Sequence, residues 1–383
     1  MSLKKKAFQM GNIALANPIV VASCPATEDI ERLCRCADAG AGAAILKSCH
    51  GIRTTPTDQG MRRFRNTDRG LWGTSTTARE LIHPEKACKI INELRTYSEM
   101  PVIPSVAAYT LDSQEWIETL LMFEANGIAC AQLDLFYLEE DLSLPETQGR
   151  LYNLILEIAC ESSIGLLPKM NQEIRPGAAI KTFADTGIVG WSILDSIRIR
   201  FPEDRRLKSP DLPVFAYANG LNAASLFGAW QFPLVCEYLY RLRTQTDLPI
   251  LAGGGVSDAR DVARLLTMGA DAVQVATPIL CEGTDWINRT CADLQNYNWT
   301  AYGCTEEAVG FIAAHAKIDP DLCTSCGRCT RQLMCTAIKE GADGPCILPG
   351  KCEGCRFCLE LCPANAICLK PNSEYQPSTA VTY

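Results

Sequence analysis

Residues 249–280 read PILAGGGVSDARDVARLLTMGADAVQVATPIL, and this stretch decides the fold of the larger part of the chain. PILA and ADAVQVATP are apolar enough to be buried strands. ARDVARLLTMGA repeats its apolar residues at intervals of three and four, which is typical of a helix. A strand, a helix and a strand in this order predict a βαβ unit with parallel strands.

The glycines between the first strand and the helix predict a phosphate site. Gly253, Gly254 and Gly255 carry no side chains, so their backbone N–H groups can approach an anion closely at the positive end of the helix dipole. Ala276 and Thr277 end the next strand, and in barrels the loops after the seventh and eighth strands commonly hold a phosphate. The alternative is a tight turn that binds no ligand.

The same alternation of strand and helix extends back through the chain. Apolar runs occur at 19–23, 43–47, 102–106, 130–136, 164–170, 188–194, 249–253 and 272–276. Eight such units in an α/β pattern favour a closed (β/α)8 TIM barrel over an open sheet, and we expect it to occupy residues 1–310. The segment 213–219 is a ninth candidate strand, which we place in the connection before the seventh strand.

Composition excludes several classes of protein. The net charge of −8 and the pI near 5.2 argue against nucleic-acid binding, which normally requires a basic face. No apolar run is long enough to span a membrane and no signal peptide is evident, so we expect a soluble, cytoplasmic protein. In such a chain, 21 cysteines indicate metal binding or redox chemistry rather than disulfides.

Ten of the cysteines lie between Cys323 and Cys368, and eight of these ten form two runs of four. The second run, KCEGCRFCLELCP, has the C-x2-C-x2-C-x3-C-P spacing of bacterial ferredoxins, in which three cysteines of a run bind one [4Fe–4S] cluster and the fourth binds the other cluster. We therefore expect residues 311–383 to form a ferredoxin-like domain with two clusters. A four-cysteine zinc site is the alternative, but zinc requires neither this spacing nor so many cysteines.

The cluster ligands follow from this pattern. One cluster is assigned Cys323, Cys326, Cys329 and Cys362, and the other Cys352, Cys355, Cys358 and Cys335. The first run, DPDLCTSCGRCTRQLMC, is irregular, because five residues rather than three separate its last two cysteines and no proline follows. Cys346 is therefore an alternative to Cys335 as the eighth ligand.

The phosphate site and the clusters together indicate a flavin. The chain has no G-x-G-x-x-G between a strand and a helix, so a Rossmann nicotinamide site is not supported. Iron–sulfur clusters pass single electrons and need a converter between one- and two-electron chemistry to act on organic molecules. We therefore assign the phosphate to flavin mononucleotide (FMN).

The barrel resembles the dihydroorotate dehydrogenase family and, more narrowly, the FMN- and cluster-containing subunit of bacterial dihydropyrimidine dehydrogenases. ANPIVVAS (16–23) fits the family's first strand, AAILKS (43–48) its second, LLPKMN (166–171) its fifth, and residues 249–280 its seventh and eighth units. The cysteine-rich tail fits the bacterial subunit, which carries such a tail behind the barrel. The resemblance thus covers almost the whole chain.

The resemblance implies a set of FMN-binding residues. They are Ala22, Ser23, Lys47, Ser48, Lys169, Gly220, Gly254, Gly255, Ala276 and Thr277. Lys47 would lie under the flavin ring and Lys169 would face its N1 side, where a fixed ammonium stabilises the negative charge of reduced flavin. Lys47 is for this reason also a catalytic candidate. The alternative for each is a lysine that extends from a strand end into water.

The pocket departs from the family on the substrate side. Where the family has Asn-Leu-Ser-Cys-Pro after the fourth strand, this chain has DLFYL, so Asp134 replaces the asparagine and Tyr137 replaces the cysteine that transfers a proton. Asp195 and Ser196 replace an Asn-Thr pair, and Ala78 replaces a further substrate-facing asparagine. The new carboxylates argue against orotate or uracil and favour a cationic or hydrogen-bond-donating substrate near Asp134, Asp195 and Ser196.

The proton carrier has several candidates. A phenol such as Tyr137 is a competent acid where its anion is stabilised, but the ring can equally serve in packing at the barrel rim. Cys49 and His50, which follow the predicted flavin residues Lys47 and Ser48, are alternative carriers.

Two functions remain open from the sequence. In the first, the chain is an FMN- and iron–sulfur-dependent oxidoreductase that acts on a C–C or C=C bond of a small cyclic substrate, dihydropyrimidine-like or other. Its clusters would exchange electrons with an NAD(P)H-oxidising flavoprotein subunit or a ferredoxin, and the resemblance implies a homodimer or an assembly with a reductase. In the second, the barrel has lost substrate chemistry and the chain only conducts electrons within a larger complex.

Overall fold

The computed structural model describes most of the chain, in two compact units. The described residues are 8–10, 13–51, 63–67, 70–76, 81–183, 185–194, 196–200, 223–296, 314–333, 335–342, 344–352 and 357–371. Except for Thr67, those up to Asn296 form the larger unit, and those from Ala314 onward form the smaller. The predicted domain boundary near residue 310 and the candidate strand at 213–219 lie outside the described residues.

The larger unit is built on a sheet of parallel strands. In spatial order these are β7 (Val102–Ile103), β4 (Ala43–Ile45), β3 (Ile19–Val21), β15 (Ala272–Val275), β14 (Ile250–Gly253), β11 (Trp191–Ile193), β10 (Gly165–Lys169), β9 (Cys130–Asp134) and β8 (Ser105–Ala107). β7 and β8 stand at opposite ends of this order, yet only Pro104 separates them in the chain. Proline has no N–H to donate, which accounts for the interruption. Because the chain runs directly from β7 into β8, the sheet returns to its starting point, as a barrel requires.

The eight predicted barrel strands are confirmed. Each of the eight apolar runs contains a strand of this sheet, and the run at 102–106 includes the break between β7 and β8. The strands are nearly continuous in apolar residues because both of their faces are covered, one by helices and the other by the barrel interior. The predicted α/β barrel is therefore the fold of the larger unit.

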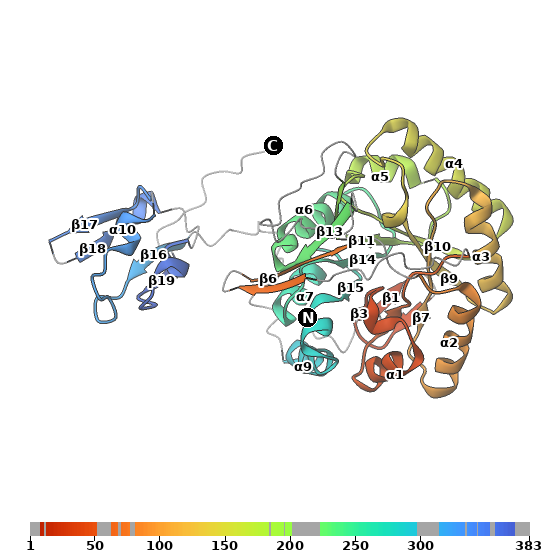
Figure 1. Cartoon of the computed structure of the whole chain (residues 1–383), viewed down its shortest axis with the longest axis horizontal. Coiled ribbons are helices and arrows are strands. Elements are labelled where there is room, and N and C mark those ends of the chain that lie inside the picture. Colours follow the sequence, from red (N-terminus) through yellow and green to blue (C-terminus); the bar gives the residue numbers. More distant parts are fainter. Residues whose placement is uncertain are drawn as a thin grey trace. The chain divides into compact units, whose positions relative to one another are not determined.

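A ring of helices surrounds the strands (Figure 1). They are α1 (Ile30–Asp38), α2 (Pro84–Tyr97), α3 (Ser113–Ala125), α4 (Pro145–Glu161), α5 (Pro176–Phe183), α6 (Phe232–Arg243), α7 (Ala259–Thr267), α8 (Thr277–Glu282) and α9 (Asp285–Gln295). Local sequence fixes several first turns: Asp29, Asp112 and Asp258 each cap a helix by accepting a hydrogen bond from a backbone N–H. Proline occupies the first or second position of α2, α4, α6 and α8, where its missing N–H leaves no bond unmade.

The apolar core has one part outside the strands and one part inside. The outer part lies between the strands and the helices and includes the fully buried Trp116 and Trp191. The inner part is smaller and fills the lower barrel with Leu15, Val20, Ala43, Ile45, Ile103, Cys130, Leu167, Leu251 and Ala272. Leu15 belongs to β2 (Ile13–Leu15), which pairs with β1 (Phe8–Met10), so this hairpin closes the N-terminal end of the barrel.

A second, four-stranded sheet is a feature that the sequence patterns do not indicate. Its order is β12 (Ile197–Arg200), β13 (Ala223–Gly228), β6 (Gly70–Thr76) and β5 (Arg63–Thr67), and β13 is antiparallel to both of its neighbours. β5 and β6 follow the barrel strand β4, whereas β12 and β13 follow β11. Both insertions leave the barrel at the carboxyl ends of strands, which is the end where barrels carry their active sites.

The described residues of the smaller unit form two strand pairs and two short helices. β16 (Ala314–Ile318) is antiparallel to β19 (Ile367–Pro371), and β17 (Ile338–Gly341) is antiparallel to β18 (Gly344–Ile347). The helices α10 (Arg328–Arg331) and α11 (Phe357–Leu361) each begin one residue before the third cysteine of a run, Cys329 or Cys358. Both of these cysteines lie in the small apolar core of the unit. The third cysteine of each run therefore has the same position in its helix and the same buried environment.

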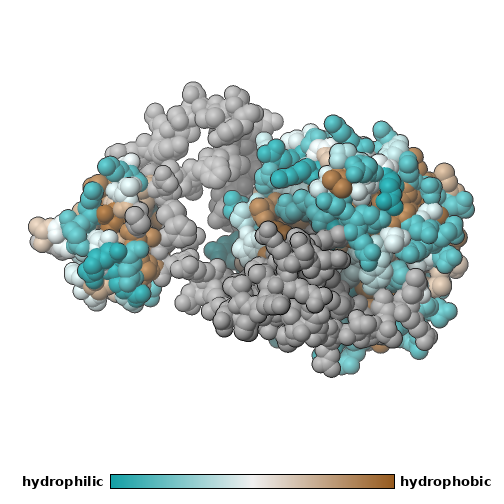
Figure 2. All heavy atoms as spheres, turned by 45° about the horizontal axis from the view of Figure 1, so that its top comes forward, coloured by the Kyte–Doolittle hydropathy of each residue, from teal (hydrophilic) through white to brown (hydrophobic). Residues whose placement is uncertain are grey.

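The described part of the chain contains no helix that is both long and apolar enough to cross a membrane. Where described residues of the larger unit are visible in Figure 2, hydrophilic side chains dominate and the hydrophobic areas are small and separate. The exposed large apolar side chains include Trp230, Leu234 and Tyr240, on or next to α6.

Candidate functional site

Three charged side chains are buried at the carboxyl ends of barrel strands. Lys47 follows β4, Asp134 ends β9 and Lys169 ends β10, and their exposed fractions are 5, 3 and 6%. Asp134 and Lys169 are partners in the parallel register of β9 and β10, so they point to the same side of the sheet. Charged side chains are seldom buried without a partner or a ligand. The burial of both lysines is inconsistent with side chains that extend into water.

Asp134 is held by the protein itself. The Ser48 hydroxyl donates to its Oδ2 atom, and the Phe136 backbone N–H donates to its Oδ1 atom at 3.2 Å. The second bond caps the short 3-10 helix η3 (Leu135–Tyr137). Ser23 Oγ lies 3.0 Å from Ser48 Oγ, so two of the predicted flavin residues connect to Asp134. Asp134 therefore stabilises the structure of the mouth itself. The sequence shows only that this residue replaces an asparagine on the substrate side, and it does not reveal the structural role.

Beneath these residues, a chain of hydrogen bonds crosses the barrel interior. The Gln132 side chain donates to Ser105 Oγ at 2.9 Å and accepts from Ser192 Oγ at 2.9 Å. Gln274 Nε2 donates to Ser192 Oγ at 3.0 Å, and Ser48 Oγ lies 3.3 Å from Ser105 Oγ. We call these five side chains, each at most 3% exposed, the polar belt. It separates the apolar lower barrel from the mouth.

The structure brings the two catalytic candidates together. Lys47 Nζ donates a hydrogen bond to Tyr137 Oη over 3.2 Å. The Tyr137 ring also makes edge contacts with Phe136 and Tyr109, at centroid distances of 5.6 and 6.4 Å, and stays partly exposed. The packing role and the proton role are therefore compatible in one side chain, because the ring packs while its hydroxyl faces an ammonium.

The alternative proton carriers are less suitable. Cys49 is 0% exposed, and its thiol donates to the Ser105 carbonyl oxygen at 3.0 Å. Burial raises the pKa of the Cys49 thiol well above its ordinary range, which opposes proton release. His50 is buried against Tyr109, and its Nε2 atom lies 3.8 Å from a Glu115 carboxylate oxygen. Both side chains are thus engaged within the protein.

The triple glycine forms a tight turn after β14. Gly254 and Gly255 have φ angles of 106° and 75°, which residues with side chains rarely adopt. A Cβ atom on Gly253 would lie 2.3 Å from the Gln274 side chain, and one on Gly255 would lie 2.4 Å from the backbone nitrogen of Phe232. The turn therefore has space for backbone only, at the start of the segment that leads into α7.

The neighbouring strands bring further predicted flavin residues to this end of the barrel. Ala276 and Thr277 follow β15 and are half-buried. Ala22 is buried after β3, where its N–H donates to the Val275 carbonyl oxygen at 2.9 Å. β14, β15 and β3 are adjacent in the sheet, so the residues that follow them share one edge.

Asn171 is a site residue that the sequence analysis does not identify. It follows Lys169 by two positions and is 2% exposed. Its Oδ1 atom accepts a hydrogen bond from the Glu173 N–H at 2.9 Å, whereas no described residue accepts one from its buried Nδ2 atom. A buried donor without an acceptor is unfavourable by about 1–3 kcal/mol, and a ligand oxygen would relieve it. The sequence signal for Asn171 is its position two residues after Lys169, because side chains two residues apart in an extended segment point to the same side.

Four of the predicted residues fall outside the described part of the chain. They are Ala78, Asp195, Gly220 and Cys355. Ser196 is described, and it lies half-buried directly before β12.

The cysteines assigned to the first cluster influence one another in the smaller unit. Burial raises the pKa of the Cys329 thiol, and the nearby sulfurs of Cys323, Cys362 and Cys326 raise it further. Within the described ranges, no three His, Cys, Asp or Glu side chains are arranged around a common point as metal ligands.

Backbone N–H groups face two of the assigned sulfurs. The Ala316 N–H donates to Cys352 Sγ at 3.2 Å, and the Ala366 N–H donates to Cys362 Sγ at 3.3 Å. Such N–H···S bonds are among the factors that tune cluster-binding thiolates.

Cys335 and Cys346 lie in different environments. Cys335 packs against the small core, whereas Cys346 is exposed in β18. Helix α11 ends directly before Cys362, whereas three residues separate the end of α10 from Cys335. The two extra residues of the first run therefore lengthen the loop after α10.

Comparisons with known proteins find similarity to several dehydrogenases. The nitronate monooxygenase family matches residues 236–285, which include the triple glycine and the end of β15. The catalytic subunit of a dihydroorotate dehydrogenase B (NAD(+)) from Methanothermobacter thermautotrophicus is 24% identical over 322 residues, covering 78% of this chain and 95% of the relative. The NAD-dependent dihydropyrimidine dehydrogenase subunit PreA of Escherichia coli K12 is 21% identical over 359 residues, covering 86% of this chain and 85% of the relative.

The fold, the strand-end residues and these matches show an α/β barrel protein that is similar to dihydroorotate dehydrogenases. More narrowly, the chain is a divergent relative of dihydroorotate dehydrogenase catalytic subunits and of the dihydropyrimidine dehydrogenase subunit PreA. The resemblance inferred from the sequence is thereby confirmed, and the low identities agree with the altered residues at the mouth.

Proposed function

We propose that the chain is an FMN- and iron–sulfur-dependent oxidoreductase that acts on a C–C or C=C bond of a small cyclic substrate. Two [4Fe–4S] clusters in residues 311–383 would exchange electrons with a partner, either an NAD(P)H-oxidising flavoprotein subunit or a ferredoxin. The observation that carries the proposal is the hydrogen bond between Lys47 and Tyr137. It joins a proton donor to the residue that the resemblance places under a flavin ring.

The described residues are suited to bound FMN. Gly254 and Gly255 form a turn that admits only backbone, which supports a phosphate cradle. Lys47 and Lys169 are buried ammonium groups that match the negative charge of a reduced flavin. The Nδ2 atom of Asn171 is a donor for a carbonyl oxygen of the ring. Bound FMN would supply hydride exchange with the substrate and single-electron exchange with the clusters.

The smaller unit offers a donor set suited to two clusters. The thiols of Cys323, Cys326, Cys329 and Cys362 are close enough to interact electrostatically. Cys335, Cys352 and Cys358 all contact the small core of the unit. The spacing of the two runs supports the assignment of three cysteines of each run to one cluster and the fourth to the other, and the interaction of Cys362 with Cys329 agrees with it.

The chain's own residues would move the proton. Tyr137 Oη would donate to, or accept from, the substrate carbon, and the Lys47 ammonium would stabilise the phenolate that remains after donation. Ser48 and Asp134 hold the start of η3, so that the Tyr137 hydroxyl stays at the mouth. The polar belt forms the lower boundary of the mouth.

The charges at the mouth favour one of the two expected substrate classes. Asp134 is bound by Ser48 and by a backbone N–H, and two buried lysines outnumber it among the described residues there. Two ammonium groups beside the substrate disfavour a cationic ring, and the carboxylates of Asp134 and Asp195 disfavour an anionic ring such as orotate. We therefore favour a neutral ring that donates hydrogen bonds, other than orotate or uracil, with Ser196 and Asp195 as further contacts.

Replacing Tyr137 by phenylalanine tests the proton role. We expect turnover of a substrate that reacts with the flavin to fall about 10²–10⁴-fold, because the ring is kept while the transferable proton is lost. Single-turnover rates measure the effect, and Tyr152→Phe on α4 is the control, with expected full activity. Unchanged turnover in Tyr137→Phe would show that the phenol is not the proton carrier.

The alternative function is an electron conductor without substrate chemistry, and the loss of the family's Asn-Leu-Ser-Cys-Pro motif favours it. Anaerobic titrations with candidate substrates distinguish this conductor from the proposed enzyme. Suitable probes are dihydroorotate, dihydrouracil, uracil and neutral nitrogen heterocycles. A probe that bleaches or shifts the flavin absorbance band identifies a substrate pocket. No response across these classes, with normal reduction of the clusters, would support the conductor instead.

Aspartate in place of Asn171 is expected to weaken FMN binding about tenfold or more, since a lost hydrogen bond to a ligand is worth about 1–3 kcal/mol. The variant keeps the oxygen that accepts the Glu173 N–H but replaces the donor by an acceptor that repels a ligand oxygen. Flavin fluorescence during titration of the apoprotein gives the affinity, with the exposed Asn92→Asp on α2 as control. Equal affinities in the two variants would remove Asn171 from the FMN site.

A further inference from the structure

Arg198 is a buried arginine at the candidate site that the sequence analysis does not include. It lies in β12 of the inserted sheet, and its side chain is 3% exposed. We infer that Arg198 is a positioning residue, which holds Tyr137 where the tyrosine hydroxyl meets Lys47. The inference rests on the proposed function for the task of Tyr137, whereas the contacts that support it do not depend on any substrate.

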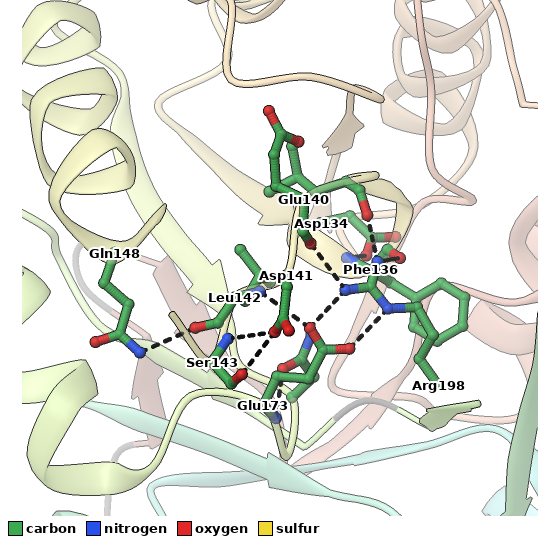
Figure 3. A network of polar contacts seen from close by, with 11 residues as sticks. Asp134, Phe136, Glu140, Asp141, Leu142, Ser143, Gln148, Glu173 and Arg198 are labelled. Carbon is green, nitrogen blue, oxygen red and sulfur yellow. Dashed lines mark hydrogen bonds and ion pairs between the residues drawn. The ribbon is translucent and has the colours of Figure 1, made fainter. Parts of the chain in front are cut away.

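The Arg198 guanidinium joins three loops of the barrel (Figure 3). Its Nε and Nη2 atoms donate to the two carboxylate oxygens of Glu173 at 2.8 and 2.6 Å, which makes a bidentate ion pair. Its Nη1 atom donates to the Phe136 carbonyl oxygen at 2.9 Å and also to the Leu138 carbonyl oxygen. Nη2 reaches the Glu140 carbonyl oxygen at 3.4 Å. The guanidinium thus connects the segments after β9, β10 and β11.

The carbonyl acceptors flank Tyr137 on both sides. Phe136 precedes the tyrosine and Leu138 follows it, so one guanidinium fixes the backbone before and after this residue. η3 is only three residues long and gains little stability from helical hydrogen bonds of its own. Asp134 holds the start of η3 through the Phe136 N–H. The end of η3 is held by Arg198.

These contacts require a guanidinium. Its five N–H donors lie in one planar fork, which can serve a carboxylate and several carbonyl oxygens at once. A lysine has the same charge, but its three donors share one nitrogen and cannot span these acceptors. Glu173 supplies the opposite charge and also accepts from the Leu142 N–H at 3.3 Å. The loop that carries Tyr137 is therefore anchored through Glu173 as well as through Arg198.

Fluorine NMR of the full chain, labelled with 3-fluorotyrosine, tests the inference without a substrate. The Tyr137 resonance is identified as the one that disappears in Tyr137→Phe. Arg198→Lys is expected to shift and broaden this resonance, because the backbone on both sides of Tyr137 loses its donors. The resonance of Tyr97, at the end of α2, should stay in place.

Arg243→Lys is the matched control. Arg243 also binds one carboxylate, of Asp271, and three backbone carbonyl oxygens, of Gly269, Thr246 and Leu248. These acceptors precede β14 and β15, at the N-terminal end of the barrel, so the Tyr137 resonance should not change.

An unchanged Tyr137 resonance in Arg198→Lys would overturn the inference, as would an equal change in Arg243→Lys. Movement of the Tyr97 resonance would reveal that Arg198→Lys has lost its fold. In that case Glu173→Gln is used instead, and it is likewise expected to shift and broaden the Tyr137 resonance. Turnover of Tyr137→Phe judges the proposed function separately. Full turnover in that variant refutes the proton role and leaves the positioning of Tyr137 intact.

Discussion

Serine in place of Cys329 is expected to remove one of two clusters and to lower the iron bound per chain from about eight to about four atoms. Cys329 is the second residue of α10, is 9% exposed, and interacts with three other assigned ligands. A serine hydroxyl lacks the soft thiolate that binds cluster iron. Iron and acid-labile sulfide, measured after anaerobic reconstitution, give the count. The FMN content should stay constant, because the barrel residues are unchanged.

Other cysteines of the same unit provide the controls. Cys368 is exposed in β19 and lies outside the assigned set, so Cys368→Ser should keep about eight iron atoms. Cys335→Ser and Cys346→Ser decide the eighth ligand, and we expect iron loss only in the first. A full iron content in Cys329→Ser, or zinc in place of iron in the unmodified protein, would contradict the cluster assignment.

Alanine in place of Gly255 is expected to abolish retention of FMN. A Cβ atom at this position would lie 2.4 Å from the backbone nitrogen of Phe232 and 2.9 Å from its Cα atom, in a residue with a φ of 75°. Backbone atoms of α6 cannot move aside as the end of a side chain can, so the turn must open. Loss of two charge-assisted hydrogen bonds to phosphate, at about 1.5 kcal/mol each, corresponds to about 100-fold weaker binding. Flavin absorbance after gel filtration measures the retention.

Gly187→Ala separates this effect from backbone strain. Gly187 has a φ of 78°, but a Cβ atom there would meet nothing within 4 Å. We expect a loss of about 1 kcal/mol in the free energy of unfolding and full retention of FMN. Equal flavin loss in the two variants, or none in Gly255→Ala, would remove the turn from the binding site.

The barrel strands could be predicted because their signal is local. Segments such as IVV in β3 and AVQV in β15 are buried on both faces and read as apolar runs. The break at Pro104 is different, since the residues on its two sides pair with different neighbours, β4 and β9. The closure depends on pairing between strands that are far apart in the chain, so it cannot be predicted from a short segment of sequence.

The parts of the site that escaped prediction depend on contacts between distant residues. Lys47 and Lys169 could be proposed because the resemblance rests on short segments, AAILKS and LLPKMN, that contain them. Arg198 is separated by 25 residues from Glu173 and by 62 from Phe136, so its role appears only when the loops meet.

Asp134 illustrates the same limit. In the sequence it is a substitution on the substrate side, and that reading predicts a contact with substrate. In the structure it accepts a hydrogen bond from Ser48, 86 residues away, and begins the turn that carries Tyr137. The residue type was informative, but its partners decide what the carboxylate does.

The polar belt divides the barrel into two regions with different tolerance for substitution. Below it, residues such as Val20 and Ile45 pack in an apolar interior where a change of volume leaves a cavity or a clash. Above it, Asp134 and Tyr137 are fixed by hydrogen bonds to Ser48 and Lys47 rather than by apolar packing. Substitutions above the polar belt are therefore expected to alter chemistry at the mouth, whereas substitutions below it are expected to lower the free energy of unfolding of the whole barrel.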